Sequence, residues 1–159
     1  MFSRFDLTHR QGYRDFLSAQ AGAFLVVEAA LDQAGVSRIL RDWKERQRSA
    51  ALSQDLRAMS LRPEAVASPT FTTDAEILGG AYVLEGARLG AAMLVRSVPL
   101  DLPTAFLKHG NPAAWRAFVS VLDDRLSSPV DLEQAVGAAT SVFRAFENSA
   151  DRVLGAHYS

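Results

Sequence analysis

The chain has 159 residues, of which 48% are hydrophobic and 22% charged, and its formal net charge at pH 7 is −1. This length predicts one domain, residues 1–159, with a core of its own, and the near-neutral charge gives no reason to expect nucleic acid or a membrane as partner. Cysteine is absent, which excludes disulfides and thiolate metal sites. The N-terminus shows no basic region followed by an apolar one, as a signal peptide would have. We therefore expect a cytoplasmic protein.

Apolar residues at steps of three and four predict a first helix, from a capping box at Thr8–Gln11 to a left-handed glycine at Gly35. Residues 1–7 form an N-terminal segment before it. A second helix is predicted over residues 42–59, and the proline-containing stretch 61–73 is predicted as a loop. The charged residues of the second helix are expected to form its solvated side: Lys44, Arg46, Arg48, Asp55 and Arg57.

A capping box at Thr73–Glu76 begins a third helix, which is strongly apolar and is predicted to end near Pro99. An asparagine followed by proline opens a fourth over residues 111–126. The last helix is predicted from Asp131, before a flexible tail at 155–159. No stretch has the two-residue alternation of a strand, so the sequence predicts an all-α fold. The most regular apolar stripe belongs to the last helix: Leu132, Val136, Ala139, Phe143, Phe146, Ala150 and Val153.

The third helix carries four glycines within residues 79–92. Each glycine in a helix interior costs roughly 0.5–1 kcal/mol relative to alanine, so a repeated use of glycine indicates close approach by something else. Gly86 and Gly90 are four residues apart and share one face of bare backbone. Either a second helix packs on that face or a flat ligand lies on it.

Residues 82–91, with the sequence Tyr-Val-Leu-Glu-Gly-Ala-Arg-Leu-Gly-Ala, resemble the distal helix of haem oxygenases, above all those of the bacterial, phytochrome-associated branch. The resemblance covers nearly the whole chain and implies a single-domain, haem oxygenase-like helical bundle. Further segments match the family's first connection, second helix, later segments and last helix in that order: residues 2–7, 13–17, 102–110, 115–118 and 139–147.

The resemblance also implies a departure from the family. There, the histidine that ligates haem iron lies on a first helix, before the segment that residues 2–7 resemble. We therefore expect a chain that is shortened at its N-terminus and lacks this proximal ligand. The loss of a helix would bare an apolar face, and that face would suit a homodimer or a protein partner.

Five residues are implied as the haem-facing part of the distal helix: Tyr82, Gly86, Ala87, Gly90 and Ala91. Ala87 stands where some branches of the family have an aspartate that organises distal water. Ala91 stands where the family usually has a further glycine, so its methyl group would narrow the distal space.

Arg88 and Arg144 are candidate contacts for haem propionates, because guanidinium groups match carboxylates. For Arg88 we favour a partly buried pair with Glu85, three residues earlier on the same helix. His9 is a candidate axial ligand of the iron, although solvated surface histidine is the more ordinary role.

The sequence leaves three interpretations of the function open. The one we favour is a degenerate haem oxygenase-like protein that acts as a non-catalytic binding or regulatory protein, with haem or with no cofactor. The second is an active enzyme that uses an unusual ligand such as His9 and an external electron donor to convert haem and O₂ to biliverdin, carbon monoxide and iron. The third is a longer natural chain that carries the ligand. Motifs of other enzymes, such as a P-loop, Gly-x-Ser-x-Gly or a Glu-x-x-His iron site, are absent.

Overall fold

The computed structural model describes residues 4–157, and all regular structure in that range is helical, as predicted. The ends of the predicted N-terminal segment and tail, residues 1–3 and 158–159, lie outside the described residues, so the family match at Phe2 does too. The α-helices are α1 (Arg10–Gln33), α2 (Trp43–Arg46), α3 (Ser49–Ala58), α4 (Asp74–Leu94), α5 (Pro112–Arg125) and α6 (Pro129–Gly155). Short 3₁₀ turns follow α1, follow α4 and precede α5: η2 (Val36–Arg38), η3 (Val95–Ser97) and η4 (Phe106–Lys108).

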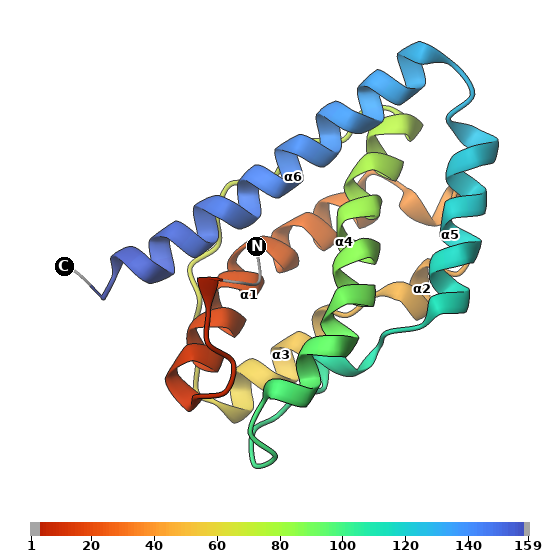
Figure 1. Cartoon of the computed structure of the whole chain (residues 1–159). Coiled ribbons are helices and arrows are strands. Elements are labelled where there is room, and N and C mark those ends of the chain that lie inside the picture. The colour runs from red at the N-terminus through yellow and green to blue at the C-terminus, as the bar shows by residue number, and fades with distance from the viewer. Residues whose placement is uncertain (1–3, 158–159) are drawn as a thin grey trace.

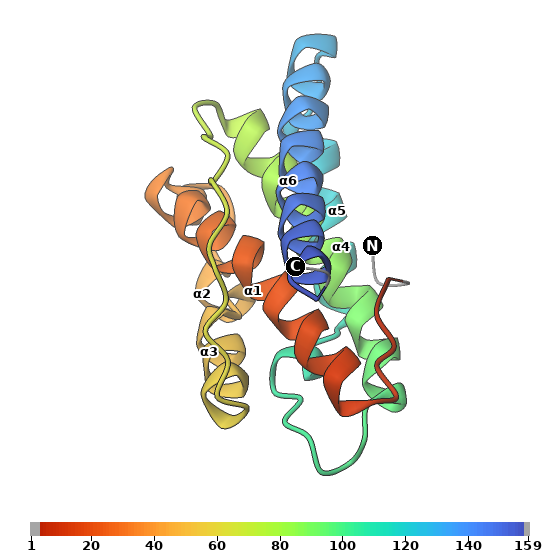
Figure 2. The same cartoon turned by 90° about the vertical axis from the view of Figure 1, so that its left-hand side faces the viewer.

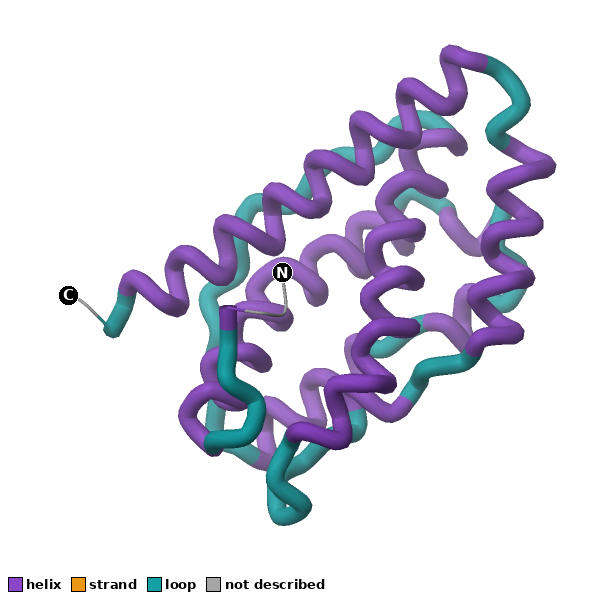
Figure 3. Tube along the Cα trace, viewed as in Figure 1, coloured by secondary structure: helices purple, strands orange, loops and turns teal. Residues whose placement is uncertain are grey.

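The bundle is built around α6, which makes the most extensive contacts of the fold with α4 and, after it, with α1. In Figure 1, α4 runs through the middle of the view, with α6 crossing on one side and α5 on the other. Figure 2, turned by 90°, shows α2 and α3 on the opposite side of the molecule from α4 and α5. The Cα trace in Figure 3 shows that loops are confined to the ends of the helices, apart from the long connection between α3 and α4.

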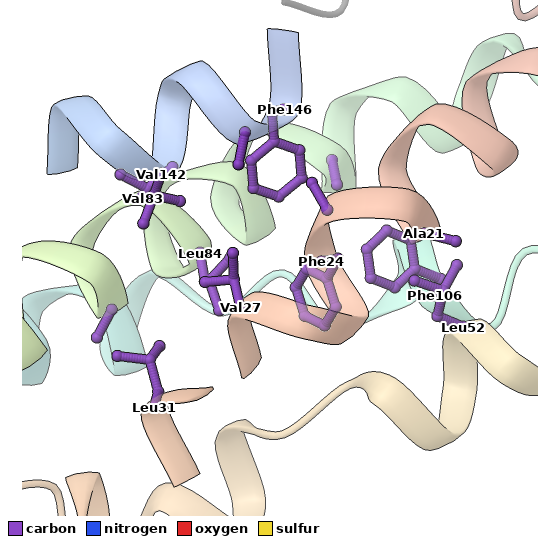
Figure 4. Close-up of a cluster of buried hydrophobic side chains, with 14 of the residues drawn as sticks. Ala21, Phe24, Val27, Leu31, Leu52, Val83, Leu84, Phe106, Val142 and Phe146 are labelled. Atoms are coloured by element: carbon purple, nitrogen blue, oxygen red, sulfur yellow. The ribbon is translucent and has the colours of Figure 1, made fainter. Parts of the chain in front are cut away.

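The core lies where α1, α4 and α6 meet (Figure 4). Phe24 of α1 packs edge-on against Phe106 of η4, with ring centroids 5.1 Å apart, and both are almost fully buried. Val83 of α4 and Phe146 of α6 close the other side of this cluster. Each such side chain contributes roughly 1.5–3 kcal/mol by leaving water, so these contacts fix the position of α4 between its neighbours.

Several predicted helix ends are confirmed. The Thr73 hydroxyl accepts from the Glu76 amide at 3.1 Å, while the Glu76 carboxylate accepts from the Thr73 amide at 3.0 Å, which is the predicted capping box of α4. The side chain of Asn111 caps α5, and Gly35 follows α1 in the left-handed region with φ of 89°. These signals are local, since each cap lies within a few residues of the amides that it satisfies.

Two predicted helix starts are wrong. Thr8 does not cap α1: its hydroxyl and its amide both donate to the nearby carboxylate of Asp6, and α1 begins after His9 without a side-chain cap. The last helix begins at Pro129, because the Ser128 hydroxyl accepts from the Asp131 amide at 3.1 Å and provides an earlier cap than the one predicted.

The predicted second helix is broken into α2 and α3 at Gln47, whose backbone is extended. The carboxylate of Glu28, from α1, accepts from the amides of Arg48 and Ser49 at 2.9 and 3.1 Å and so caps the new helix. The guanidinium carbon of Arg48 then lies 4.9 Å from the ring centroid of Phe24 and 4.7 Å from that of Phe106. The prediction of a solvated charged side is therefore wrong for its central residues, Arg46, Arg48 and Asp55, which are buried.

The segment Asp74–Ser97 has the length and apolar composition of a membrane span, with a mean hydropathy of 1.2. It packs within the bundle, however, against α1, α5 and α6. Core helices of globular proteins meet the same criterion, and Glu85 and Arg88 in its middle form buried ion pairs with protein partners.

Candidate functional site

A groove lies between α4, α5 and α6, and we call it the α4–α5–α6 groove. Its volume is about 370 Å³, within the range of roughly 300–1,000 Å³ that is usual for ligand pockets. Its lining is almost entirely apolar and includes Leu78 and Tyr82 of α4, Leu122 of α5, and Val136 and Phe143 of α6. A planar, apolar ligand suits such a lining, because few polar groups would lose water on binding.

The predicted apolar stripe of α6 divides between the core and this groove. Phe146 and Ala150 are buried as expected. Val136 is 57% exposed and Phe143 is 44% exposed, and both line the groove instead. Exposed apolar side chains that are gathered on one face mark a binding surface more often than a plain surface helix.

The glycines of α4 have two different roles. A Cβ atom on Gly79 would lie 2.1 Å from the carbonyl oxygen of Ala135, so at this point the backbones of α4 and α6 are in direct contact. A Cβ atom on Gly86 would meet only the ring of Trp115, at an ordinary 3.8 Å. Helix packing therefore accounts for Gly79, whereas Gly86 leaves space.

An aromatic row borders the groove beside Gly86. The ring centroids of Tyr82 and Trp115 are 5.8 Å apart, and those of Trp115 and Phe118 are 6.1 Å apart. Tyr82 is 42% exposed, Trp115 is half-buried and Phe118 is fully buried. The row thus runs from Tyr82 in the groove, past Trp115 beside Gly86, into the core at Phe118.

The other predicted distal residues lie at different depths. Ala87 and Gly90 are half-buried. Ala91 is 3% exposed and belongs to the hydrophobic core, so its methyl group packs in the interior and does not line the groove. Of the predicted set, only Tyr82 lines the groove, and Gly86 lies one helical turn further along α4, against Trp115.

Arg88 is directed into the protein. It is 6% exposed, its guanidinium donates to the carbonyl oxygen of Arg46, and a second contact of 3.7 Å joins it to Glu85. Burial, partly offset by the charge of Glu85, lowers the pKa of Arg88. Its Nε atom has no hydrogen-bond partner among residues 4–157. This geometry matches the buried pair favoured from the sequence, and Arg88 is remote from any ligand in the groove.

Arg144 is exposed on α6 and follows Phe143, which lines the groove, in the sequence. A second cation, which the sequence did not single out, lies nearby: Arg4 forms an ion pair of 2.8 Å with Asp151 and shares a surface hollow with Phe143 and Glu147. Nothing in the sequence indicated that Arg4 is near this surface, because its partner, Asp151, lies far away in the sequence, on the last helix.

Comparison with known proteins agrees with this geometry. No family model matches the sequence. A haem oxygenase of Xanthomonas campestris pv. campestris (strain 8004) is 32% identical over 111 residues, which cover 65% of this chain and 67% of the relative. The chain belongs to the haem oxygenase family.

The fold agrees as well. The haem oxygenase of Neisseria meningitidis, whose crystal structures contain bound NO and CO, superposes with a TM-score of 0.76 at 22% sequence identity. The match covers 92% of this chain and 78% of that one. The haem oxygenase-like bundle predicted from the sequence is therefore confirmed.

The groove can be compared with the chemistry of haem, which is the ligand of this family. Among the described residues, it offers no ligand for the iron. A porphyrin is flat and apolar, and it carries its carboxylates on one edge. Leu78, Tyr82 and Phe143 are among the apolar residues that line the groove, Trp115 packs on Tyr82, and Arg144 follows Phe143 on α6. The apolar lining therefore suits the macrocycle, and an exposed guanidinium is next in sequence to a lining residue.

The histidines of this haem oxygenase family member lie away from the groove. His9 is exposed and forms an ion pair of 3.4 Å with Asp6, and His157 pairs with Asp15 at 3.0 Å. His109 lies in the loop before α5, where partial burial and then the charge of Arg88 lower its pKa. Within residues 4–157, none of the three lines the groove, and no cluster of metal-binding side chains is present.

Proposed function

We propose that this haem oxygenase family member binds haem in the α4–α5–α6 groove and does not cleave it. The observation that carries the proposal is an apolar groove, lined by Tyr82 of the distal helix and Phe143 of α6, which no imidazole of the described residues lines. Haem can bind by burial of its macrocycle alone, whereas haem cleavage needs iron held by a rigid axial ligand. The chain would then act as a binding or regulatory protein.

Each wall of the groove has a separate task in this proposal. Leu78 and Tyr82 of α4 would lie against the macrocycle, and Trp115, which packs on Tyr82, would help to exclude water. Phe143 would close the side formed by α6, and Arg144, next to it in sequence, would pair with a propionate. Haem would supply redox and O₂ chemistry when bound, and these residues determine only its affinity and orientation.

A haemin titration followed by absorbance tests the proposal. We expect a saturable shift of the Soret band at one haemin per chain, unchanged in His9→Ala, and no biliverdin when ascorbate is added. Gly86→Leu should abolish the shift, since its side chain would displace the Trp115 ring, which packs on Tyr82 of the groove. Gly137→Leu is the matched control, because Gly137 on α6 is exposed and a Cβ there meets nothing within 4 Å. Behaviour of free haemin with the unaltered chain would refute haem binding.

The second candidate is an active, biliverdin-producing haem oxygenase that receives electrons from an external donor. One observation favours it: the relative from Xanthomonas campestris, 32% identical over 111 residues, is a haem oxygenase. In that case His9→Ala would remove a low-spin haem spectrum, and ascorbate would yield biliverdin from the unaltered chain. Those two results together would replace the first proposal by the second.

The same proposal includes the localisation of the protein and its partners. We place the protein in the cytoplasm, without nucleic-acid or membrane partners. In the absence of haem, the exposed apolar side chains of the groove would pair two copies of the chain or bind another protein. Sedimentation velocity with and without haemin tests the first possibility, since haemin should dissociate a dimer that uses this face.

A further inference from the structure

The helix that carries the aromatic wall is weakly seated in the bundle. Within α5, only Phe118 is fully buried, whereas α6 buries seven residues along its length. The rest of α5 is half-buried or exposed, including Trp115 at the groove. Few apolar contacts therefore hold α5 in place, and elements of this kind open locally more easily than a core helix does.

One buried guanidinium joins α5 to α4. Arg46, the last residue of α2, is 4% exposed. Its Nη1 donates to the carboxylate of Glu85 at 2.9 Å, and its Nη2 donates to the carbonyl oxygen of Ala114 at 3.2 Å. The third donor, Nε, reaches Asp42 at 2.8 Å. The guanidinium carbon also lies 5.8 Å from the centre of the Phe118 ring.

The two residues held by Arg46 are the direct neighbours of Gly86 and Trp115, which lie against each other where α4 meets α5, beside Tyr82 of the groove. Glu85 precedes Gly86 on α4, and Ala114 precedes Trp115 on α5. A guanidinium is planar and its donors have fixed directions. Because one rigid group holds both helices, the distance between Gly86 and the Trp115 ring depends on it.

We infer that Arg46 is a positioning residue for the groove: it fixes α5 against α4 and so sets the gap between Trp115 and Gly86. This inference rests on the proposed function only where it concerns haem, since the attachment of α5 exists without a ligand. Lysine cannot replace Arg46, because its single ammonium group cannot reach Asp42, Glu85 and the Ala114 carbonyl together.

Arg46→Lys tests the inference, since it keeps the charge that faces Glu85 and should fold. Arg38→Lys is the matched control, because Arg38 pairs with Asp74 at 3.4 Å on the exposed first turn of α4, away from α5. The first measurement is hydrogen exchange of the haem-free protein. We expect the amides of α5 to exchange about tenfold faster in Arg46→Lys, with α1 and α6 unchanged and no effect in Arg38→Lys.

Two exchange results would overturn the inference. One is α5 exchange equal to that of the unaltered chain, and the other is a uniform rise over all helices, which would indicate a general loss of stability. Arg46→Met provides a second variant, in which the same selective rise over α5 is expected to be larger.

Haemin titration then separates the inference from the proposed function. We expect Arg46→Lys to weaken haemin binding about tenfold, with Arg38→Lys unchanged. If α5 loosens while haemin binding keeps its affinity, Arg46 does not set the groove and the inference fails. If the unaltered chain binds no haemin but α5 still loosens selectively, haem binding fails and Arg46 remains the residue that positions α5.

Discussion

The two halves of α4 use the same residue type for opposite purposes. In the first half, Gly79 and Gly80 are enclosed, one by the backbone of α6 and the other by the ring of Phe71. In the second half, Gly86 has only the edge of the Trp115 ring near it, at a distance that leaves room for a methyl group. A glycine-rich helix is therefore not in itself a ligand site, and what surrounds each glycine decides its role.

The largest effect should come from Gly79→Ala. The added methyl group would overlap the backbone of Ala135, which cannot rotate away as a side chain can. Overpacking of this kind costs about 1–3 kcal/mol, and we expect the upper end, seen as a fall of several degrees in Tm by thermal unfolding. A Tm equal to that of the unaltered chain would show that α4 and α6 can separate here at no cost.

Gly80→Ala should destabilise the protein less. The added methyl group would lie 2.6 Å from the ring of Phe71, which is a side chain in the connection before α4 and can move. We expect a loss of about 1 kcal/mol in the free energy of unfolding. Phe71→Leu in the same chain should recover part of it, because the shorter side chain leaves room. No recovery in that double variant would mean that something other than the ring limits the space.

Gly86→Ala should have the opposite sign. Its methyl group fits at 3.8 Å from Trp115, so the alanine adds helix propensity without a collision. We expect a gain of roughly 0.5–1 kcal/mol in unfolding free energy, similar to that of Gly137→Ala on α6. Chemical denaturation of both variants measures this. A loss at Gly86 alone would show that α4 and α5 lie closer together here in solution.

The sequence predicted those parts of the fold whose causes are local. The caps at Thr73 and Asn111 and the turn at Gly35 depend on residues within one helical turn, and all three are confirmed. The break at Gln47 could not be predicted, because the carboxylate that caps α3 comes from Glu28 on another helix.

The same limit applies to the site. Periodicity placed Phe143 and Phe146 on one stripe, but only the packing of α4 and α5 decides that the first lines the groove and the second lies in the core. Gly86 was found because its residue type is unusual in a helix. Arg46 was missed, since its partners lie 39 and 68 positions away in the sequence. Its charge alone led to the prediction that Arg46 is exposed to solvent, whereas in the structure it joins α2, α4 and α5.

The smallest effect concerns the first turn of α4 and its dependence on pH. Hydrogen bonds from Thr72 and Thr73 lower the pKa of Glu76 in the folded protein. A lowered pKa means that the ionised carboxylate stabilises the fold fully above about pH 4.3 and that this contribution is lost as the pH falls through the folded value. Because Glu76 is largely solvated, we expect less than about 1 kcal/mol.

Glu76→Gln measures this contribution. Its amide can still accept from the Thr73 amide, but it has no charge to lose, so its Tm should fall less between pH 6 and pH 3 than that of the unaltered chain. At pH 6 the variant should be slightly less stable, since a charged acceptor forms the stronger hydrogen bonds and interacts favourably with the helix N-terminus. Glu76→Gln should leave haemin binding unchanged, because the first turn of α4 lies three helical turns from Gly86. A parallel loss of haemin affinity would mean that the two halves of α4 are coupled, and the division between a packed half and an open half would then be wrong.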